Sequence, residues 1–502
     1  MPNSTSTLSH SAAWQALVEH AASAEIASLT QLVQHDPARQ TRFQRHGVGM
    51  CLDFAFERVN DTTLRLLESL AHQQAWTQWR ARMFAGEPIN TTEARAAWHV
   101  ALRGTLTHRP AQCDTDHART VQLAEAIRQG TRHGATGKKF THLVHMGTGG
   151  SDLGPRLLVD ALGSFNAQRF RVDFVSNMDP VALDRVLAQC DPAQTLIVLA
   201  SKSFTTQETI TNASAARDWL IAGLPGGADW RQHMVAATSH AEAARAFGIH
   251  TQDILSVPVW VGGRYSIWSA IGLTPMIVIG PTAFAAFLAG GAEMDQHFLH
   301  APFAQNLPAL LALLGVWNIN FLDAHTLAVL PYAHALTQLP AYLQQLDMES
   351  NGKSIDRDGR PIDYATAPVV WGAAGTVGQH SFHQLLHQGT LCVPCEFITV
   401  DTPMGDVTRH HILNANASAQ AQALALGRPA DGLKPWQLHP GNRPSLTLRL
   451  AKLDAHTLGA LIALYEHKVF MQGCIWNINS FDQFGVEYGK QLAAEQLRPL
   501  QR

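Results

Sequence analysis

The sequence predicts an α/β fold of mainly parallel sheets flanked by helices, with helical segments at both ends of the chain. Its 502 residues are 46% hydrophobic and only 15% charged, which is typical of a compact globular protein with large buried cores. From Thr141 onward, short apolar runs alternate with helical segments, as they do in βαβ units. The length and this alternation favour two or three domains.

The first hundred or so residues have the spacing of helices. Residues 63–84, TLRLLESLAHQQAWTQWRARMF, repeat apolar side chains at helical intervals. Residues 91–103, TTEARAAWHVALR, start with a Thr-Thr-Glu sequence typical of a helix N-terminus. We therefore expect residues 1–110 to form a helical segment that packs on the larger of two following domains.

The next part of the chain alternates between strands and helices. Four short apolar runs have the composition of buried parallel strands, at residues 141–146, 171–177, 195–200 and 234–238. A Gly-rich loop then gives way to a long apolar helical stretch at residues 260–280, as expected at a domain boundary. A smaller α/β domain is therefore predicted over residues 111–275.

A second and larger α/β domain is predicted over residues 276–502. Its clearest strands are VVWGAAG at 369–375 and TLCVPCEFITV at 390–400. The chain closes with two stretches at helical spacing, residues 458–478 and 486–497.

Composition and charge exclude several classes of partner. The formal net charge of -3 gives no sign of a nucleic-acid or membrane-surface binder. The N-terminus lacks the basic start and apolar core of a signal peptide. Apolar runs such as 275–280 and 307–317 are too short or too interrupted to cross a bilayer. We expect a cytoplasmic protein with neither nucleic-acid nor membrane partners.

The sequence predicts no metal and no redox site. Cys392 and Cys395 form a CxxC within a strand-like run, whereas a redox pair needs a helix N-terminus, and no second CxxC completes a zinc site. His383 and His387 are four residues apart on a predicted helix but lack an HExxH context. The segment from Asp347 resembles a calcium loop but departs from it at several ligand positions.

Two junctions between a strand and a helix have the residues of a phosphate site. The first, HMGTGGSDLGP, brings glycines and a serine directly after a strand, where free backbone N–H groups and the helix dipole attract an anion. The second, LASKSFTTQET, adds hydroxyl donors and a lysine. The candidate residues are Gly147, Gly149, Gly150 and Ser151 in the first loop, and Ser201, Lys202, Ser203, Thr205 and Thr206 in the second.

Two alternative interpretations of these loops stay open. The serines and threonines can be helix caps, although capping explains one or two hydroxyls rather than the four around Lys202. The glycine loop can be a dinucleotide fingerprint, as in a nicotinamide dehydrogenase, but Asp152 takes the place of the third glycine and Asp173 lies mid-strand.

The stretch LDMESNGKS, residues 346–354, contains the candidate general base, Glu349. A helix is predicted to end at Asn351-Gly352, so this carboxylate lies at the partially negative end of a helix, a position that favours accepting a proton. Gln345 precedes it by four residues and shares its face.

Three further residues are candidates for catalysis. Arg264 lies beside two flexible glycines and can face an anion, or can form a structural ion pair. His380 follows a Gly-rich turn and is a candidate acid or base. Lys490 lies on the last predicted helix, where exposed lysines are common.

Seven segments together resemble the glucose-6-phosphate isomerase (phosphoglucose isomerase) family, in that family's order and from about Phe84 to Lys490. They are FAGEPINTTEARAAWHVALR, GTGGSDLGP, SKSFTTQET, GGRYSIWSAIG, MESNGKS, GTVGQHSFHQLLHQGT and NSFDQFGVEYGK. The resemblance implies two sugar-isomerase (SIS) domains, a homodimer, and reversible conversion of glucose 6-phosphate into fructose 6-phosphate in glycolysis and gluconeogenesis. It implies neither a metal nor another cofactor.

The same resemblance implies a role for each site residue. Glu349 would move the proton between C1 and C2, and Arg264 would stabilise the enediolate. His380, supplied by the partner subunit, and Lys490 would assist ring opening. Gln345 and Gln483 would line the sugar. The residues that would hold its phosphate are Ser201, Lys202, Ser203 and Thr206, with Gly150 and Ser151 nearby. Chemistry supports these roles, because the isomerisation needs a base, an acid/base group for the ring oxygen and a cation for the developing charge.

The chain departs from the family pattern at several positions. Thr148 replaces a usual isoleucine, Ser203 a threonine, Val377 an asparagine and Tyr488 a leucine, and residues 52–60 also differ. These departures bear on rate and specificity and not on the reaction class.

Two alternative functions stay open: an isomerase that also acts on mannose 6-phosphate, and a sugar-phosphate-binding regulator without catalysis. The regulator is disfavoured because it has no need of a base such as Glu349.

Overall fold

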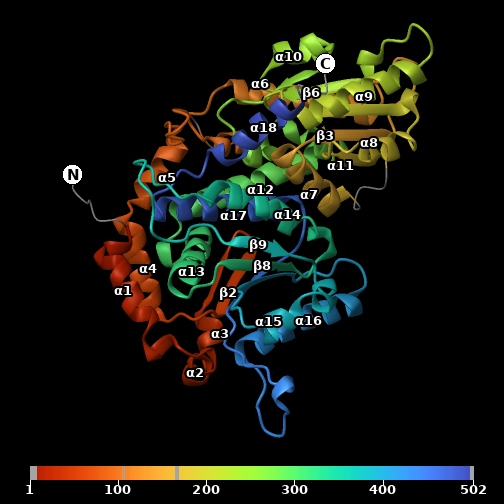
Figure 1. The fold of residues 1–502 in the computed structure, drawn as a ribbon. Coiled ribbons are helices and arrows are strands. Elements are labelled where there is room, and N and C mark those ends of the chain that lie inside the picture. Colours follow the sequence, from red (N-terminus) through yellow and green to blue (C-terminus); the bar gives the residue numbers. More distant parts are fainter. Residues whose placement is uncertain (1–7, 105, 107, 164–168, 498–502) are drawn as a thin grey trace.

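A computed structural model describes residues 8–104, 106, 108–163 and 169–497, and contains two sheets (Figure 1). The first sheet has five parallel strands in the order β4-β3-β5-β6-β7. Its strands are β3 (His142–Gly147), β4 (Arg171–Val175), β5 (Thr195–Ala200), β6 (Met234–Thr238) and β7 (Ile254–Ser256). The helices that accompany these strands along the chain are α6 (Gln112–Gln129), α7 (Leu153–Leu162), α8 (Pro180–Leu187), α9 (Gln207–Gly223) and α10 (Ala241–Phe247).

The second sheet has six strands in the order β1-β2-β11-β10-β8-β9. These strands are β1 (Gln44–Gly47), β2 (Met50–Phe56), β8 (Thr326–Pro331), β9 (Val369–Gly372), β10 (Cys395–Val400) and β11 (Ser445–Leu450). Strands β8 to β11 pair in parallel, whereas β2 is antiparallel to both β1 and β11. Each sheet is therefore mainly parallel, and helices cover it, which confirms the predicted α/β class.

Long apolar helices run between the two sheets (Figure 1). In α17 (Ala455–Ile475) every residue from Thr457 onward is buried, and this helix packs along α12 (Pro281–His300). The adjoining α11 (Leu273–Ile279) and α13 (Leu307–Phe321) are also largely buried. A mainly apolar helix that buries all its faces needs such a core around it.

Shorter helices complete the chain. The N-terminal ones are α1 (Ala12–Ala21), α2 (Leu29–His35), α3 (Arg39–Arg42), α4 (Asp61–Gln73) and α5 (Trp76–Ala85). The later ones are α14 (Leu339–Leu343), α15 (His383–Gln388), α16 (Val407–Leu426) and α18 (Glu487–Leu497). Among the described residues, no helix combines the length and the apolar character needed to cross a membrane.

The strands predicted at 141–146, 171–177, 195–200 and 234–238 are confirmed as β3 to β6, and those at 369–375 and 390–400 contain β9 and β10. Within the second run, Cys395 is a buried strand residue, whereas Cys392 precedes the strand.

Two secondary-structure predictions for the N-terminal segment were wrong. Residues 44–56 form β1 and β2 instead of helix, because the apolar β2 pairs with β11 and the polar β1 pairs with β2 at the edge of the six-stranded sheet. Residues 91–103 form turns and a short 3₁₀ turn, His99–Arg103. Thr92 donates to Asp482 Oδ2 (2.6 Å) instead of capping a helix, and Ala94 adopts a positive φ of 49°.

Candidate active site

Glu349 lies on a π-helical turn. Helix α14 continues directly into this turn, Gln344–Glu349, and the helical conformation ends at Asn351. Such turns insert an extra residue into a helix and often occur at functional sites. The buried Asp347 on the turn pairs with Lys468 of α17, which fixes the turn to the core. The side chain of Glu349 keeps 24% of its exposure and so remains accessible to a ligand.

Arg264 faces this carboxylate from a second segment. It lies in a 3₁₀ turn, Gly263–Trp268, and is only 3% exposed. Its Nη1 lies 3.6 Å from Glu349 Oε1 and donates to Gln483 Oε1 at 3.0 Å. The predicted base, the predicted cation and one predicted sugar ligand therefore meet at one point.

The first glycine loop packs against the same group. A β-carbon on Gly150 would lie 2.1 Å from the carbonyl oxygen of Gly263, so only glycine allows the backbones to approach this closely. Gly149 has a φ of +58°, and a β-carbon there would lie 2.8 Å from Gln345 Nε2. Ser151 is buried beside them. Gly150, Ser151 and Gln345 therefore border the pair formed by Arg264 and Glu349.

The second loop follows β5, the neighbour of β3 in the five-stranded sheet, so both loops start at the same edge. Thr206 precedes α9 but makes no side-chain capping bond, and Ser203 Oγ accepts from Thr205 Oγ1 at 2.9 Å. The buried Ser201 hydroxyl has no hydrogen-bond partner among the described residues. The alternative that these hydroxyls are helix caps therefore loses support, and an anion would satisfy them.

Lys202 adds a charge to this loop. Its Nζ donates to the carbonyl oxygen of Val259 at 2.7 Å, and Arg95 Nη1 donates to the same oxygen at 2.8 Å. Burial, followed by the charge of Arg95, lowers the pKa of Lys202 to about 8, while Glu93 opposes the shift. An anion in the loop would favour the protonated amine.

The chain segment that carries Gln483 is fixed by a buried carboxylate. Asp482 accepts from Thr92 and from Asn479 Nδ2 (2.9 Å), and it forms an ion pair with Lys353 (3.2 Å). Lys353 Nζ also donates to the carbonyl oxygens of Glu349 (3.0 Å) and Ser350 (2.8 Å). This lysine satisfies carbonyl groups at the end of the helix and offsets their partial negative charge.

A single chain does not bring His380 and Lys490 to this group. His380 is exposed on a short turn, Val377–His380, and Lys490 is exposed on α18, where it pairs with Glu487 at 2.9 Å. No hydrogen bond or ion pair within the described residues joins either side chain to Arg264 or Glu349.

Sequence reasoning missed four residues of this site: Tyr265, Ser350, Lys353 and Asp482. Each lies within one of the quoted motifs, immediately beside or close to a predicted residue. Ser350 Oγ accepts from Arg264 Nε at 2.6 Å and lies 2.9 Å from the Tyr265 hydroxyl. The available signal was adjacency alone, since Tyr265, Ser350 and Asp482 are polar residues directly beside a predicted one.

The alternative sites that the sequence raised receive little support. Asp173 lies in the middle of β4 and pairs with His142 (2.6 Å) and Arg171 (2.9 Å), so it is not free to bind a ribose. Burial raises the pKa of the Cys395 thiol, which disfavours a reactive thiolate. No group of three or more metal-binding side chains occurs in the described part of the chain.

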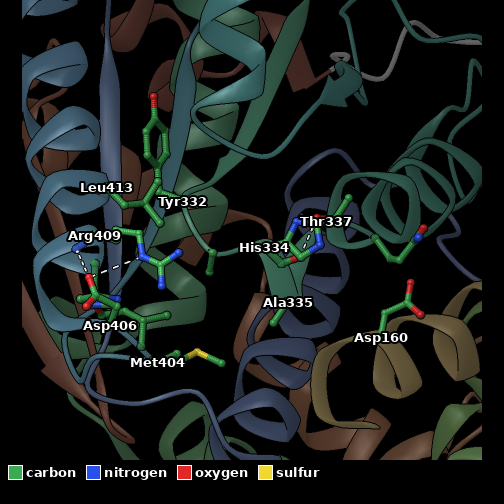
Figure 2. Close-up of a pocket in the computed structure, with 14 residues that line it drawn as sticks. Asp160, Tyr332, His334, Ala335, Thr337, Met404, Asp406, Arg409 and Leu413 are labelled. Carbon is green, nitrogen blue, oxygen red and sulfur yellow. Dashed lines mark hydrogen bonds and ion pairs between the residues drawn. The ribbon is translucent and has the colours of Figure 1, made fainter. Parts of the chain in front are cut away.

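A cavity of about 960 Å³ lies elsewhere, next to the carboxyl ends of β8 and β10 (Figure 2). Figure 2 shows Asp406 and Arg409 turned toward one another in its wall, with 3.5 Å between Arg409 Nε and Asp406 Oδ1. Its lining contains none of the predicted site residues. The convergence of predicted residues, and not the size of the cavity, therefore identifies the candidate site.

Comparisons with known proteins match the chain over most of its length. The family model described as phosphoglucose isomerase matches residues 53–502. Glucose-6-phosphate isomerase of Anaeromyxobacter sp. (strain K) is 46% identical over 520 residues, which cover 100% of this chain and 95% of that protein. The enzyme of that name from Deinococcus radiodurans is 47% identical, covering 96% and 92%. The crystal structure of a glucose-6-phosphate isomerase from Chlamydia trachomatis superposes with a TM-score of 0.89 at 34% identity, covering 99% of this chain and 97% of that one.

Proposed function

The chain belongs to the phosphoglucose isomerase family, and on this basis we propose that it interconverts glucose 6-phosphate and fructose 6-phosphate through a cis-enediol intermediate. The observation that carries the proposal is the pairing of an accessible carboxylate, Glu349, with the buried cation Arg264 at 3.6 Å. Aldose–ketose isomerisation needs these two charges side by side, because a proton leaves carbon while negative charge develops on the neighbouring oxygen.

In this proposal Glu349 removes the proton from C2 of the open-chain aldose and returns it to C1. A base placed in hydrogen-bond reach contributes about 10²–10⁴-fold to such a proton transfer. Nη1 of Arg264 stabilises the enediolate oxygen, and its burial strengthens the interaction because little water screens it. The reaction transfers no net electrons, so the proposal assigns no redox cofactor.

The two loops at the edge of the five-stranded sheet bind the phosphate. Ser201, Lys202, Ser203 and Thr206 supply hydroxyls and a charge, and Gly150 and Ser151 bring backbone N–H groups near the sugar. Phosphate binding at a distance from the reacting carbons orients them over Glu349. Gln345 and Gln483, which flank the Arg264–Glu349 pair, line the sugar.

We further propose that the active unit is a homodimer in which His380 acts across the interface. The support is that His380 is exposed in the single chain, where no hydrogen bond or ion pair among the described residues joins it to Arg264 or Glu349. Lys490 assists ring opening when α18 approaches the bound sugar. The protein then serves glycolysis and gluconeogenesis in the cytoplasm.

Hydrogen exchange at C2 of glucose 6-phosphate in heavy water tests the proposal. Wild-type protein should incorporate deuterium and form fructose 6-phosphate, and Glu349→Gln should slow both by about 10²-fold or more. A wild-type protein that does neither excludes the isomerase, and a Glu349→Gln variant that exchanges at the wild-type rate excludes this base. Mannose 6-phosphate, supplied in the same assay, tests the alternative of a broader specificity: formation of fructose 6-phosphate from it would show that the protein isomerises both sugars.

A further inference from the structure

The guanidinium of Arg264 is held on two sides by three buried acceptors. Nε donates to Ser350 Oγ at 2.6 Å, and Nη2 donates to the carbonyl oxygens of Ser480 (2.6 Å) and Asp482 (3.2 Å). Only Nη1 points toward side chains that border the proposed sugar site, Glu349 and Gln483. The planar fork of an arginine has fixed donor directions, so these bonds set which N–H groups face the substrate.

The hydroxyl that binds Nε belongs to a buried pair. Ser350 is 0% exposed and Tyr265 is 1% exposed, and their oxygens are 2.9 Å apart. Burial raises the pKa of Tyr265, so it keeps its proton and remains a donor at neutral pH. On the Nε side, Arg264 is therefore held by side chains, whereas on the Nη2 side it is held by backbone carbonyl groups.

The ring of Tyr265 is itself fixed. It stacks on His99 with 4.5 Å between ring centroids and 23° between planes, and it lies 5.5 Å from the ring of Phe481. Burial lowers the pKa of His99 well below its ordinary value, so the ring is neutral and adds no positive charge beside Arg264. Phe481 lies between Ser480 and Asp482, whose carbonyl groups bind Nη2.

We propose that Ser350 and Tyr265 are positioning residues that hold Arg264 by its Nε, so that Nη1 stays directed at the proposed base and at the sugar oxygen. Ser350 follows Glu349 directly in the chain, so the turn that carries the base also holds the cation, and a movement of one moves the other. The inference rests on the proposed function, because it assigns these hydroxyls to the isomerase reaction.

Three variants test it in the full-length protein. Ser350→Ala removes the acceptor for Nε, and Tyr265→Phe removes one hydroxyl while keeping the stacked ring. Tyr364→Phe is a matched control, because its hydroxyl donates to the carbonyl oxygen of Trp476 (2.6 Å) and has no contact with Arg264. We expect Ser350→Ala to lower kcat by about tenfold or more with KM changed less than about threefold, since a misplaced group loses transition-state interactions more than ground-state binding.

A double-mutant cycle separates positioning from general stability. If Tyr265 acts through Ser350, the double variant should have the kcat of Ser350→Ala alone, and both substitutions should be nearly silent in an Arg264→Lys background. Two results would overturn the inference. In the first, the effects of Tyr265→Phe and Ser350→Ala on kcat are independent of each other. In the second, neither variant lowers kcat more than Tyr364→Phe does at equal thermal stability.

Crystal structures of Ser350→Ala and Tyr265→Phe give a readout that does not require activity. We expect the guanidinium to rotate, so that Nη1 moves away from Glu349 Oε1. An unmoved guanidinium in both variants overturns the inference. If the wild-type protein fails to isomerise glucose 6-phosphate, the proposed function fails, and these structures still decide whether the two hydroxyls position Arg264.

Discussion

Nη1 of Arg264 lies 3.6 Å from Oε1 of Glu349, although the two residues come from different segments and only the carboxylate is accessible. The π-helical turn brings Glu349 to this point, and the close approach of Gly150 to Gly263 brings the first glycine loop to the same point. The distance is longer than a direct hydrogen bond, so a sugar oxygen can interact with both charges.

Arg264→Lys should lower kcat by about 10²–10³-fold while the protein stays folded, because a single ammonium cannot replace the planar donors that hold the cation and face the enediolate. Steady-state kinetics with glucose 6-phosphate measure the effect. Arg171→Lys is a matched control, since Arg171 forms a partly exposed ion pair with Asp173 away from the site. A fall of less than about fivefold for Arg264→Lys contradicts its role at the enediolate.

Gly150→Ala should lower both stability and activity, because the added β-carbon would lie 2.1 Å from the Gly263 carbonyl oxygen. The substitution must therefore push the first glycine loop away from the turn that begins at Gly263. We expect a loss of about 1–3 kcal/mol in unfolding free energy, as for other overpacked sites, and a larger KM for the sugar phosphate. Denaturant unfolding and kinetics measure these changes. Gly226→Ala, where a β-carbon meets no atom within 4 Å, serves as the control and should change neither.

Three of the strands that sequence reasoning predicted correctly share a physical reason. β3, β5 and β6 are buried on both faces, so they appear as continuous apolar runs that local composition reveals. β2 was missed because its identity as a strand depends on pairing with β11, almost four hundred residues later. The Thr-Thr-Glu sequence at Thr91 predicted a helix wrongly, because the neighbouring Thr92 bonds to Asp482 from the other end of the chain.

The candidate site shows the same division. Glu349, Arg264 and the first glycine loop were predicted from residue chemistry next to turns and helix ends, and the structure brings these three together. Ser350 and Tyr265 were not predicted, since their contact with Arg264 is a tertiary one that no spacing reveals. The positions of His380 and Lys490 relative to the site stay predictions, because each depends on a surface of the chain that is exposed in one subunit.

The affinity for sugar phosphate should fall above about pH 8. The pKa of Lys202 is lowered to about 8, so in the free protein this amine loses its charge as the pH rises through that value. We expect log(kcat/KM) to decrease above pH 8 with a slope approaching −1. Lys202→Arg keeps its charge and should remove this limb. A wild-type profile that stays flat to pH 9.5 contradicts the assignment of Lys202 to the phosphate.

Glu57→Gln should stabilise the protein relative to wild type, and this gain in Tm should be larger at pH 8 than at pH 5. Burial raises the pKa of Glu57 from 4.5 to about 8, so the folded protein holds a proton that the unfolded chain has already released. That stabilisation is complete below about pH 4.5 and is lost as the pH rises through 8. Glutamine mimics the neutral acid at every pH, so the difference in Tm should widen across this window.

Thermal unfolding at half-unit pH intervals measures this difference. Glu242→Gln is the control. The Glu242 side chain is 95% exposed, and its Oε1 lies 3.9 Å from Arg245 Nη2, so the two form a weak surface ion pair. A constant difference in Tm between Glu57→Gln and wild type from pH 5 to pH 8 would show that Glu57 does not hold a proton in the folded state.

Mixing two inactive variants should restore activity if His380 acts across a dimer interface. In a hybrid of one Glu349→Gln chain and one His380→Ala chain, one site has both defects and the other has an intact Glu349 and an intact His380. After random subunit exchange half of the dimers are hybrids, so about a quarter of the wild-type activity should return.

Pairing Glu349→Gln with Arg264→Lys is the control, because both residues belong to the same chain's site and no hybrid site is intact. Recovery in the first mixture alone assigns His380 to the partner subunit, whereas no recovery in either shows that His380 does not act across the interface.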